Sequence, residues 1–385
     1  MVKLLIITAM FPDKYNPNGE VFVQHQANEL AKSFDVRVIA TRLKRKLSIE
    51  EDNQKGYRLI YIYMPYIKHF FLSLVCSYRI FAIPRINRVI KEWKPDIIHV
   101  HDFKHVPELF QLSYYLRRYN IPRYLTVHNL RSHPSVIKRQ CTRWFYRMTF
   151  RGAYTGWNHI FTVNDRIKEI IYGDAGVTQI SNIGNAVGPV PEVPEAQIEQ
   201  YRRLLTGTSF KIISVGNLKA EKGFEFLLES VGELKKKHIP IQVVIVGKGE
   251  EKENLTALVN SLGLTDSIIF TGDISNALVR NLYPLFDAFV LPSYSETFGV
   301  VYIEAMYAGL PAVGVKGQGI DGVIRDGING FLVNPRDSDD LAGKIEYLIN
   351  NREAVRTIAK QGQGLVRNEY QLSQLIKKII KEYER

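Results

Sequence analysis

Two glutamates in the second half of the chain have a setting that suits the binding of a sugar or a phosphate. Glu296 falls in the turn after an apolar run that ends at Leu291, and Glu304 falls inside the apolar helix expected next. The start of such a helix offers backbone amides without partners, which suit sugar hydroxyls or phosphate oxygens. In the alternative interpretation, Glu296 merely belongs to the start of the helix and Glu304 is a solvated helical position.

A lysine has a comparable setting near the start of the second half. Lys222 lies between an expected strand that ends at Val215 and the helix expected after Gly223. A cation beside a helix N-terminus can meet the charge that builds on a departing diphosphate. The alternative is an ordinary solvated lysine.

Three histidines accompany expected strands of the first half. His128 directly follows the apolar run 124–127, and its alternative role is that of a histidine satisfied within its own loop. His99 and His101 alternate along one strand, so they face the same way. No third ligand follows them at a spacing that fits a metal site. We therefore expect no metal and no other cofactor.

The paired glutamates resemble a family signature. Glu296, seven intervening residues and Glu304, with Phe298 and Gly299 between them, are similar to the signature of glycosyltransferase family 4. Members of this family are retaining enzymes with the two-lobed GT-B fold. The resemblance implies that Glu296 lies beside the donor sugar as a catalytic residue. It also implies that the amides at Phe298, Gly299 and Val300 hold sugar hydroxyls and that Glu304 binds the ribose.

Further segments resemble the same family in the same order. Residues 215–223 are similar to a segment whose arginine and lysine bind the diphosphate; Lys222 keeps the lysine, but Asn217 replaces the arginine, so another basic residue is expected to compensate. His128 takes the place of the family histidine that faces the transferred sugar, which implies a catalytic role. Residues 17–20 resemble a glycine-rich loop on the acceptor side, which adds Gly19 to the expected site. Residues 271–274 are expected to border the nucleotide base through Ile274.

The elements that must position these residues follow an alternating pattern. Short apolar runs alternate with amphipathic stretches, which is typical of parallel sheets covered by helices. Expected strands are 4–9, 36–40, 59–63, 97–100, 124–127 and 160–163 in the first half, and 212–215, 243–246, 268–270, 288–291 and 312–315 in the second. The sequence thus predicts an α/β protein with two doubly wound, Rossmann-like domains and a site in the cleft between them.

The domain boundaries follow from a proline-rich break. Three prolines between residues 189 and 194 exclude helix and central strand. We expect an acceptor-side domain over 1–187, a linker over 188–198 and a nucleotide-sugar-binding domain over 199–370. Residues 371–385 are expected to form a helix that packs back on the first domain.

Composition indicates a globular protein of more than one domain. The 385 residues are 45% hydrophobic and 23% charged, which excludes a disordered or fibrous chain. The two cysteines, Cys76 and Cys141, give no disulfide framework or zinc spacing, so a reducing, cytoplasmic compartment fits. The apolar stretch 70–75 is far too short to cross a membrane.

The net charge of +12 is unevenly distributed. Residues 1–190 hold 28 Lys and Arg against 14 Asp and Glu, a balance of +14, which leaves −2 for the remainder. Such asymmetry favours an anionic partner for the first half. Arginines at 139, 143, 147 and 151 recur every fourth residue beside aromatic residues, as in an interfacial helix. We expect this half to dock on an anionic membrane, on its cytoplasmic face.

The sequence therefore predicts a retaining glycosyltransferase that moves a sugar from a nucleotide diphosphate donor to a hydroxyl of a glycan or lipid-linked acceptor. Its overall look is similar to bacterial enzymes that extend cell-surface polysaccharides or teichuronic acids. A nucleotide-sugar epimerase of the same fold is one alternative, and the release of a free sugar isomer without acceptor would identify it. A basic nucleic-acid-binding protein is another, although the first half shows no recognised binding module, so we expect no nucleic acid.

Overall fold

The computed structural model describes residues 1–15, 21–53, 56–65, 76–101, 106–130, 140–205, 207 and 209–385, with residues 140–146 described by their backbone alone. The chain divides into two compact units. Unit 1 comprises Met1–Gly184 and Leu375–Arg385, and unit 2 comprises Asn185–Gln374. The chain therefore passes between the units twice.

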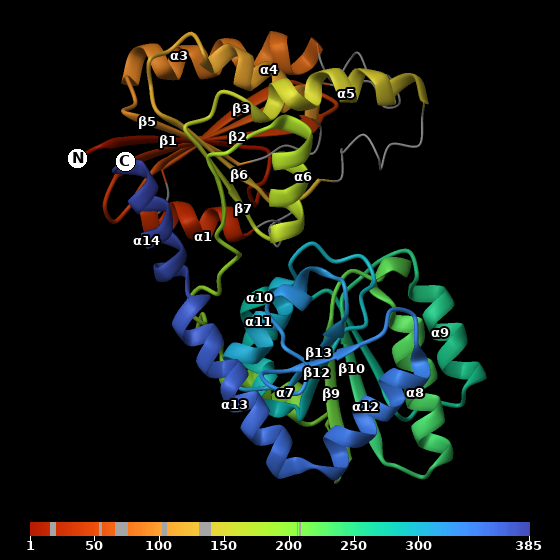
Figure 1. Ribbon diagram of the computed structural model, residues 1–385. Coiled ribbons are helices and arrows are strands. Elements are labelled where there is room, and N and C mark those ends of the chain that lie inside the picture. The colour runs from red at the N-terminus through yellow and green to blue at the C-terminus, as the bar shows by residue number, and fades with distance from the viewer. Residues whose placement is uncertain are drawn as a thin grey trace. The chain divides into compact units, whose positions relative to one another are not determined.

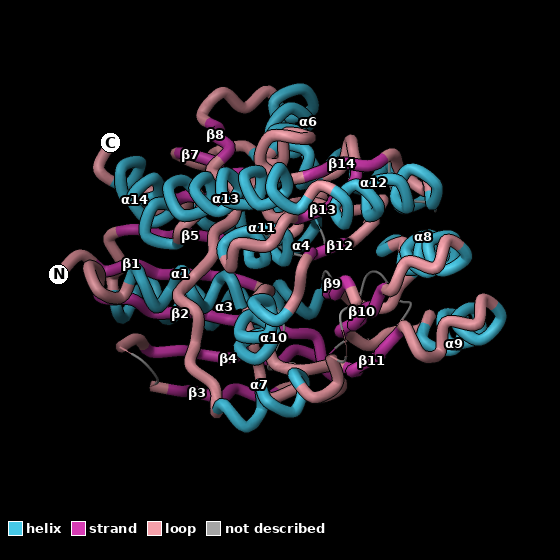
Figure 2. The backbone as a smooth tube through the Cα atoms, turned by 90° about the horizontal axis from the view of Figure 1, so that it is seen from below, coloured by secondary structure: helices cyan, strands magenta, loops and turns pink. Residues whose placement is uncertain are grey.

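Unit 1 is built on one sheet with the strand order β3-β4-β2-β1-β5-β6-β7-β8 (Figures 1 and 2). Its strands are β1 (Lys3–Thr8), β2 (Asp35–Lys44), β3 (Ser48–Asp52), β4 (Arg58–Pro65), β5 (Ile97–His101), β6 (Arg123–Val127), β7 (His159–Thr162) and β8 (Ile180–Asn182). The central strands β1 and β5 are buried and mainly apolar, because helices cover both faces of the sheet. One feature departs from the expected parallel pattern, since β3 pairs with β4 in antiparallel register.

Helices connect the strands of unit 1 and bury one apolar side each. They are α1 (Val21–Leu30), α3 (Ile83–Trp93), α4 (Val106–Leu116), α5 (Gln140–Tyr154), α6 (Asp165–Ala175) and α14 (Leu372–Tyr383), with a π-helical turn at Tyr78–Ala82. Helix α3 buries Ile86, Ile90 and Trp93, which share one helix face at spacings of four and three. Figure 1 shows α3, α4 and α5 on one side of the sheet and α1 on the other.

Unit 2 has a fully parallel sheet with the order β11-β10-β9-β12-β13-β14 (Figure 2). Its strands are β9 (Phe210–Val215), β10 (Ile241–Val246), β11 (Ile268–Gly272), β12 (Ala288–Val290), β13 (Ala312–Val315) and β14 (Phe331–Val333). Its helices are α7 (Glu195–Arg202), α8 (Phe224–Lys236), α9 (Lys252–Ser261), α10 (Asn276–Leu282), α11 (Val300–Tyr307), α12 (Ser338–Asn350) and α13 (Arg352–Glu369). Single 3-10 turns occupy Ala220–Lys222, Tyr283–Leu285 and Gly319–Gly322. This strand order is that of a doubly wound fold.

The predicted α/β class with two doubly wound sheets is confirmed, and every apolar run predicted as a strand overlaps an observed strand. Strands β3, β8 and β14 were not predicted. The segment expected as a linker lies within unit 2, and α7 begins in it at Glu195. In the parts of the chain that the structure describes, no helix is long and apolar enough to cross a membrane.

Candidate functional site

The site-forming loops of unit 2 follow two neighbouring strands. Strands β9 and β12 lie side by side at the centre of the sheet, where the strand order reverses. In doubly wound sheets, ligands bind at such a switch point, outside the carboxyl ends of the strands. Lys222 lies in the loop after β9 and Glu296 in the loop after β12, so both predicted residues belong to this point.

Lys222 and Glu296 form an ion pair. The Lys222 Nζ lies 2.6 Å from Glu296 Oε2, and the side chains are 19% and 15% exposed. The other carboxylate oxygen, Oε1, accepts a hydrogen bond from the backbone of Thr297 at 3.1 Å. The interpretation of Lys222 as an ordinary solvated lysine is therefore wrong. A fixed cation and a fixed carboxylate instead lie side by side. The cation suits an anionic group, and the carboxylate suits a hydroxyl that donates a hydrogen bond.

Close backbone packing holds the loops of this pair. Gly223 has a φ of +69°, and a Cβ at this position would lie 2.2 Å from the carbonyl oxygen of Pro292. A Cβ on Gly319 would lie 2.0 Å from the carbonyl oxygen of Thr297. Both glycines are thus required for the approach of neighbouring loops. The Gly319 amide donates to the Glu296 carbonyl at 2.9 Å, which fixes the backbone that carries the carboxylate.

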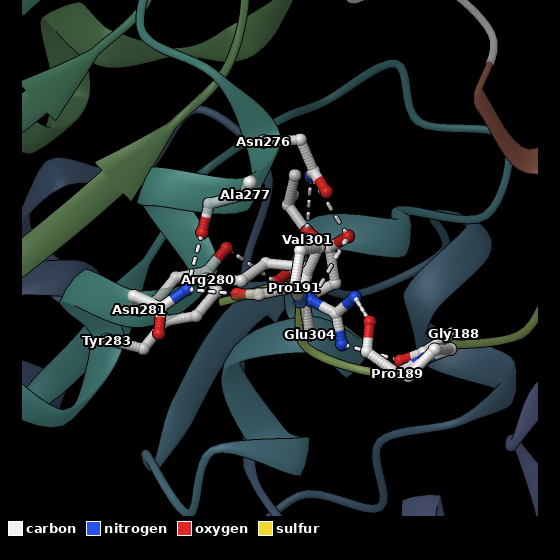
Figure 3. Close-up of polar contacts among 10 residues, drawn as sticks. All are labelled: Gly188, Pro189, Pro191, Asn276, Ala277, Arg280, Asn281, Tyr283, Val301 and Glu304. Carbon is white, nitrogen blue, oxygen red and sulfur yellow. Dashed lines mark hydrogen bonds and ion pairs between the residues drawn. The ribbon is translucent and has the colours of Figure 1, made fainter. Parts of the chain in front are cut away.

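Glu304 is a buried carboxylate, so its interpretation as a solvated helical position is wrong. Phe298 is also buried, and α11 begins at Val300 directly after Gly299. Asn276 Nδ2 donates to both oxygens of Glu304, at 3.1 and 3.4 Å, and Arg280 Nε lies 4.0 Å from Oε1 (Figure 3). Burial raises the pKa of Glu304, whereas the Asn276 hydrogen bonds and the Arg280 charge oppose that rise.

Two further residues of unit 2 were predicted for the site, Asn217 and Ile274. Among the described residues, no hydrogen bond joins either of them to the three charged groups above. Asn217 is exposed in the loop after β9. Ile274 is half-buried and precedes Ser275, whose side chain caps α10. Because α10 carries Asn276 to Glu304, Ile274 lies at the start of the helix that supports the carboxylate.

The predicted histidine of unit 1 belongs to a buried column of three. His128 Nε2 lies 3.0 Å from His101 Nδ1, and the rings of His101 and His99 stack at 4.7 Å, which confirms that the two face the same way. His99 in turn hydrogen-bonds Thr126 Oγ1 and the hydroxyl of Tyr383 on α14. His128 is therefore not satisfied within its own loop, because its partner comes from β5.

Burial keeps this column neutral. It lowers the pKa of His101 to about 3 and the pKa values of His99 and His128 well below the ordinary value. Among the described residues, His128 Nδ1 and His101 Nε2 have no hydrogen-bond partner. A neutral, oriented imidazole can offer a hydrogen bond, and it is a poor acid at neutral pH.

Gly19 lies outside the described residues. Within the described ranges, no three His, Cys, Asp or Glu side chains gather as a metal site would require. Sequence reasoning missed Asn276, Arg280 and Gln318, whose Oε1 accepts from the Glu296 amide at 3.1 Å. None of these three belongs to a motif; only the fold brings them to the two glutamates.

Comparison with known proteins gives two family matches. The model of "Glycosyltransferase Family 4" matches residues 19–189, and that of "Glycosyl transferases group 1" matches residues 197–364. Together they cover most of both units.

Curated relatives are similar over part of their length. Alpha-D-kanosaminyltransferase of Streptomyces kanamyceticus is 32% identical over 42% of this chain and 42% of its own. Sulfoquinovosyl transferase SQD2 of Arabidopsis thaliana is 29% identical over 77% of this chain and 57% of its own. The chain thus spans about half the length of these relatives.

A solved structure shows the same fold over the full length. HepE of Anabaena, in complex with UDP-glucose, has a TM-score of 0.73 and 18% identity, with 100% of each chain covered. At this identity the likeness shows the fold alone, which is the GT-B arrangement of two parallel-sheet α/β domains.

Proposed function

This chain belongs to the glycosyltransferases of family 4, and from that premise we propose that it moves a sugar from a nucleotide diphosphate donor to an acceptor hydroxyl with retention of the anomeric configuration. The Lys222–Glu296 pair at the switch point of unit 2, beside the first turn of α11, carries this proposal. It supplies one cation for a diphosphate and one carboxylate for sugar hydroxyls.

The proposed roles follow from the charges that change during transfer. As the bond between the sugar and the diphosphate breaks, negative charge builds on the diphosphate and positive charge on the sugar. Lys222 and the amides at the start of α11 stabilise the diphosphate. Once Lys222 pairs with the diphosphate, Glu296 accepts a hydrogen bond from a sugar hydroxyl. Glu304 accepts hydrogen bonds from the ribose hydroxyls. His128 orients the sugar as a neutral hydrogen-bonding group.

Uridine diphosphate sugars are the first donors to test. HepE was solved with UDP-glucose, and its fold is shared over the whole chain. The acceptor that we propose is a glycan or a lipid-linked glycan of cell-surface polysaccharide synthesis. The positive balance of residues 1–190 supports this proposal, because lipid-linked intermediates lie at an anionic membrane surface.

The stereochemistry of the donor tests the proposed reaction. With UDP-glucose or a related UDP-sugar, product formed in the presence of an acceptor should keep the anomeric configuration of the donor when followed by NMR. Addition of a chelator should leave the rate unchanged, because Lys222 and helix amides meet the diphosphate charge. An inverted product, or activity that depends strictly on manganese or magnesium, would contradict the proposal. Release of an isomerised sugar would instead identify an epimerase.

Membrane docking through α5 is a separate expectation. Arg147 and Arg151 are exposed on α5, Arg139 lies outside the described residues, and the Arg143 side chain is not described. Of the apolar residues beside these arginines, Phe150 is buried, whereas Met148 is exposed. Each basic residue near an anionic leaflet contributes about 1 kcal/mol, and salt screens this attraction.

A sedimentation assay measures this docking. The protein should pellet with phosphatidylserine-containing vesicles at low salt and be released by added salt. Glutamine at positions 139, 143, 147 and 151 should reduce pelleting by at least about tenfold, on the scale of 1 kcal/mol per charge. The matched control replaces four exposed basic residues of unit 2 by glutamine: Lys236, Lys237, Arg356 and Lys360. Equal pelleting of both variants would refute docking through α5.

A further inference from the structure

Arg280 is a buried cation with an unusual set of partners. It lies on α10, and its side chain is 2% exposed. Nη1 donates to the carbonyl of Pro189 and Nη2 to the carbonyl of Gly188, each at 2.7 Å (Figure 3). A buried charge persists only when its donors are satisfied and a counter-charge lies nearby. The two carbonyls satisfy two of its five N–H donors.

The two carbonyls belong to the segment that follows the first passage of the chain into unit 2. Val187, just before it, forms backbone hydrogen bonds with Tyr370 and Leu372, which precede the return passage. The next residue of α10, Asn281, donates to the Pro191 carbonyl at 2.7 Å. Prolines bar this segment from a helix or a central strand, and side chains from α10 hold three of its carbonyls instead. Arg280 is thus anchored on an immobilised piece of backbone.

The counter-charge is Glu304. Arg280 Nε lies 4.0 Å from its Oε1, and both side chains are at most 8% exposed. The other polar groups of the described chain that face this carboxylate are Asn276, on α10, and Tyr283, whose own pKa is raised partly by the Glu304 charge. Neither carries a positive charge. Among these facing groups, Arg280 alone carries a positive charge that stabilises the ionised form of Glu304, which burial destabilises.

We propose that Arg280 is a positioning residue for the nucleotide: anchored on the Gly188 and Pro189 carbonyls, it holds Glu304 as an ionised carboxylate in the orientation that accepts the ribose hydroxyls. This inference rests on the proposed function, because it assumes that Glu304 contacts the ribose. Arg280 acts through Glu304 and does not touch the donor.

Loss of the guanidinium charge has a specific consequence. In Arg280→Met, Glu304 stays buried but loses the cation that opposes its raised pKa, so it takes up a proton closer to neutral pH. A protonated carboxyl is a weaker acceptor for the ribose hydroxyls. Since the pKa of Glu304 is raised further in this variant, recognition of the ribose is lost at low pH. It returns as the pH rises through the raised pKa of Glu304.

Calorimetry between pH 6 and 9 isolates this effect when it compares the Kd for UDP with the Kd for 2′,3′-dideoxy-UDP. Both ligands share the base and the phosphates, so the titration of those groups cancels in the ratio of the two Kd values. The wild-type protein should prefer UDP by about 10- to 100-fold, the scale of hydrogen bonds to a charged group. In Arg280→Met the preference should fall below about threefold at pH 6.5 and recover at higher pH. Arg280→Lys should retain the preference, because it keeps the charge.

Two results would overturn the proposal. One is an Arg280→Met protein that binds both ligands more weakly by the same factor, which indicates a merely structural role. The other is a loss of preference that does not depend on pH. If UDP, ADP and GDP all fail to bind the wild-type protein, the proposed function itself is contradicted, and the ion pair is then tested by stability alone.

A comparison of melting temperatures also covers the case in which Arg280→Met is too unstable for calorimetry with the ligands. Removal of one partner leaves an uncompensated buried charge, whereas removal of both does not. The double variant Arg280→Met/Glu304→Gln should therefore melt at a higher temperature than Arg280→Met, although both leave the Gly188 and Pro189 carbonyls unpaired. A double variant that is no more stable than Arg280→Met would show that Arg280 and Glu304 are not coupled, which overturns the proposal.

Discussion

Replacement of Lys222 by methionine is expected to lower kcat by about 100- to 1000-fold, the scale seen when a group that stabilises transition-state charge is removed. Lys222 is largely buried, and its ammonium is held by Glu296 at 2.6 Å. This fixed cation meets the diphosphate as its charge grows, so its loss affects the transition state more than the bound donor. The fall should therefore appear in kcat with a smaller change in KM.

A neighbouring lysine provides the control for this measurement. Lys219 lies in the same loop, but it is exposed, so Lys219→Met removes the same charge from the surface. It should retain kcat within about threefold, because surface charges are screened by solvent. Lys222→Arg should recover part of the activity, since it restores the charge. Equal activities of Lys222→Met and Lys219→Met would exclude Lys222 from the reaction.

The sheets were predictable because their strands are buried on both faces. Runs such as those in β10 and β12 are apolar almost throughout, which separates them from the amphipathic helices around them. Strand β3, with the sequence Ser-Ile-Glu-Glu-Asp, has no such signal. It lies at the sheet edge and is a strand only because it pairs with β4, which no local pattern encodes. Strand β14 is three residues long and is equally hard to distinguish from a loop.

The site was predictable in its motifs but not in its partners. The spacing of Glu296 and Glu304 relates them to one another, yet Lys222 is 74 residues from Glu296 in the chain. His99 and His101 could be placed on one side of a strand by alternation. Their relation to His128 required the pairing of β5 with β6, which sets His101 opposite Thr126, two residues before His128. No pattern in the sequence pointed to Arg280, because the carbonyls that it contacts are more than 90 residues away along the chain.

The two glutamates should fail in different ways when each is replaced by glutamine. Glutamine is preferable to alanine at position 304, because it keeps the shape of the side chain around the buried Arg280. Glu304→Gln should raise the Kd for UDP by about 10- to 100-fold, since it weakens hydrogen bonds from the ribose to a charged acceptor. The loss should be small for 2′,3′-dideoxy-UDP, which lacks those hydroxyls.

Glu296→Gln should instead act on turnover. Its carboxylate balances Lys222 and is proposed to accept from the sugar, so UDP, which has no sugar at that position, should bind within about threefold of the wild-type Kd. The value of kcat should fall by about 10- to 100-fold, as expected for an interaction that strengthens in the transition state. Glu353→Gln, at an exposed position of α13, serves as the control for loss of a carboxylate and should match the wild type in both measurements. Calorimetry with UDP and steady-state kinetics with the donor separate the two roles. If Glu296→Gln weakened UDP binding while Glu304→Gln only slowed turnover, the assignment of the two carboxylates would be reversed.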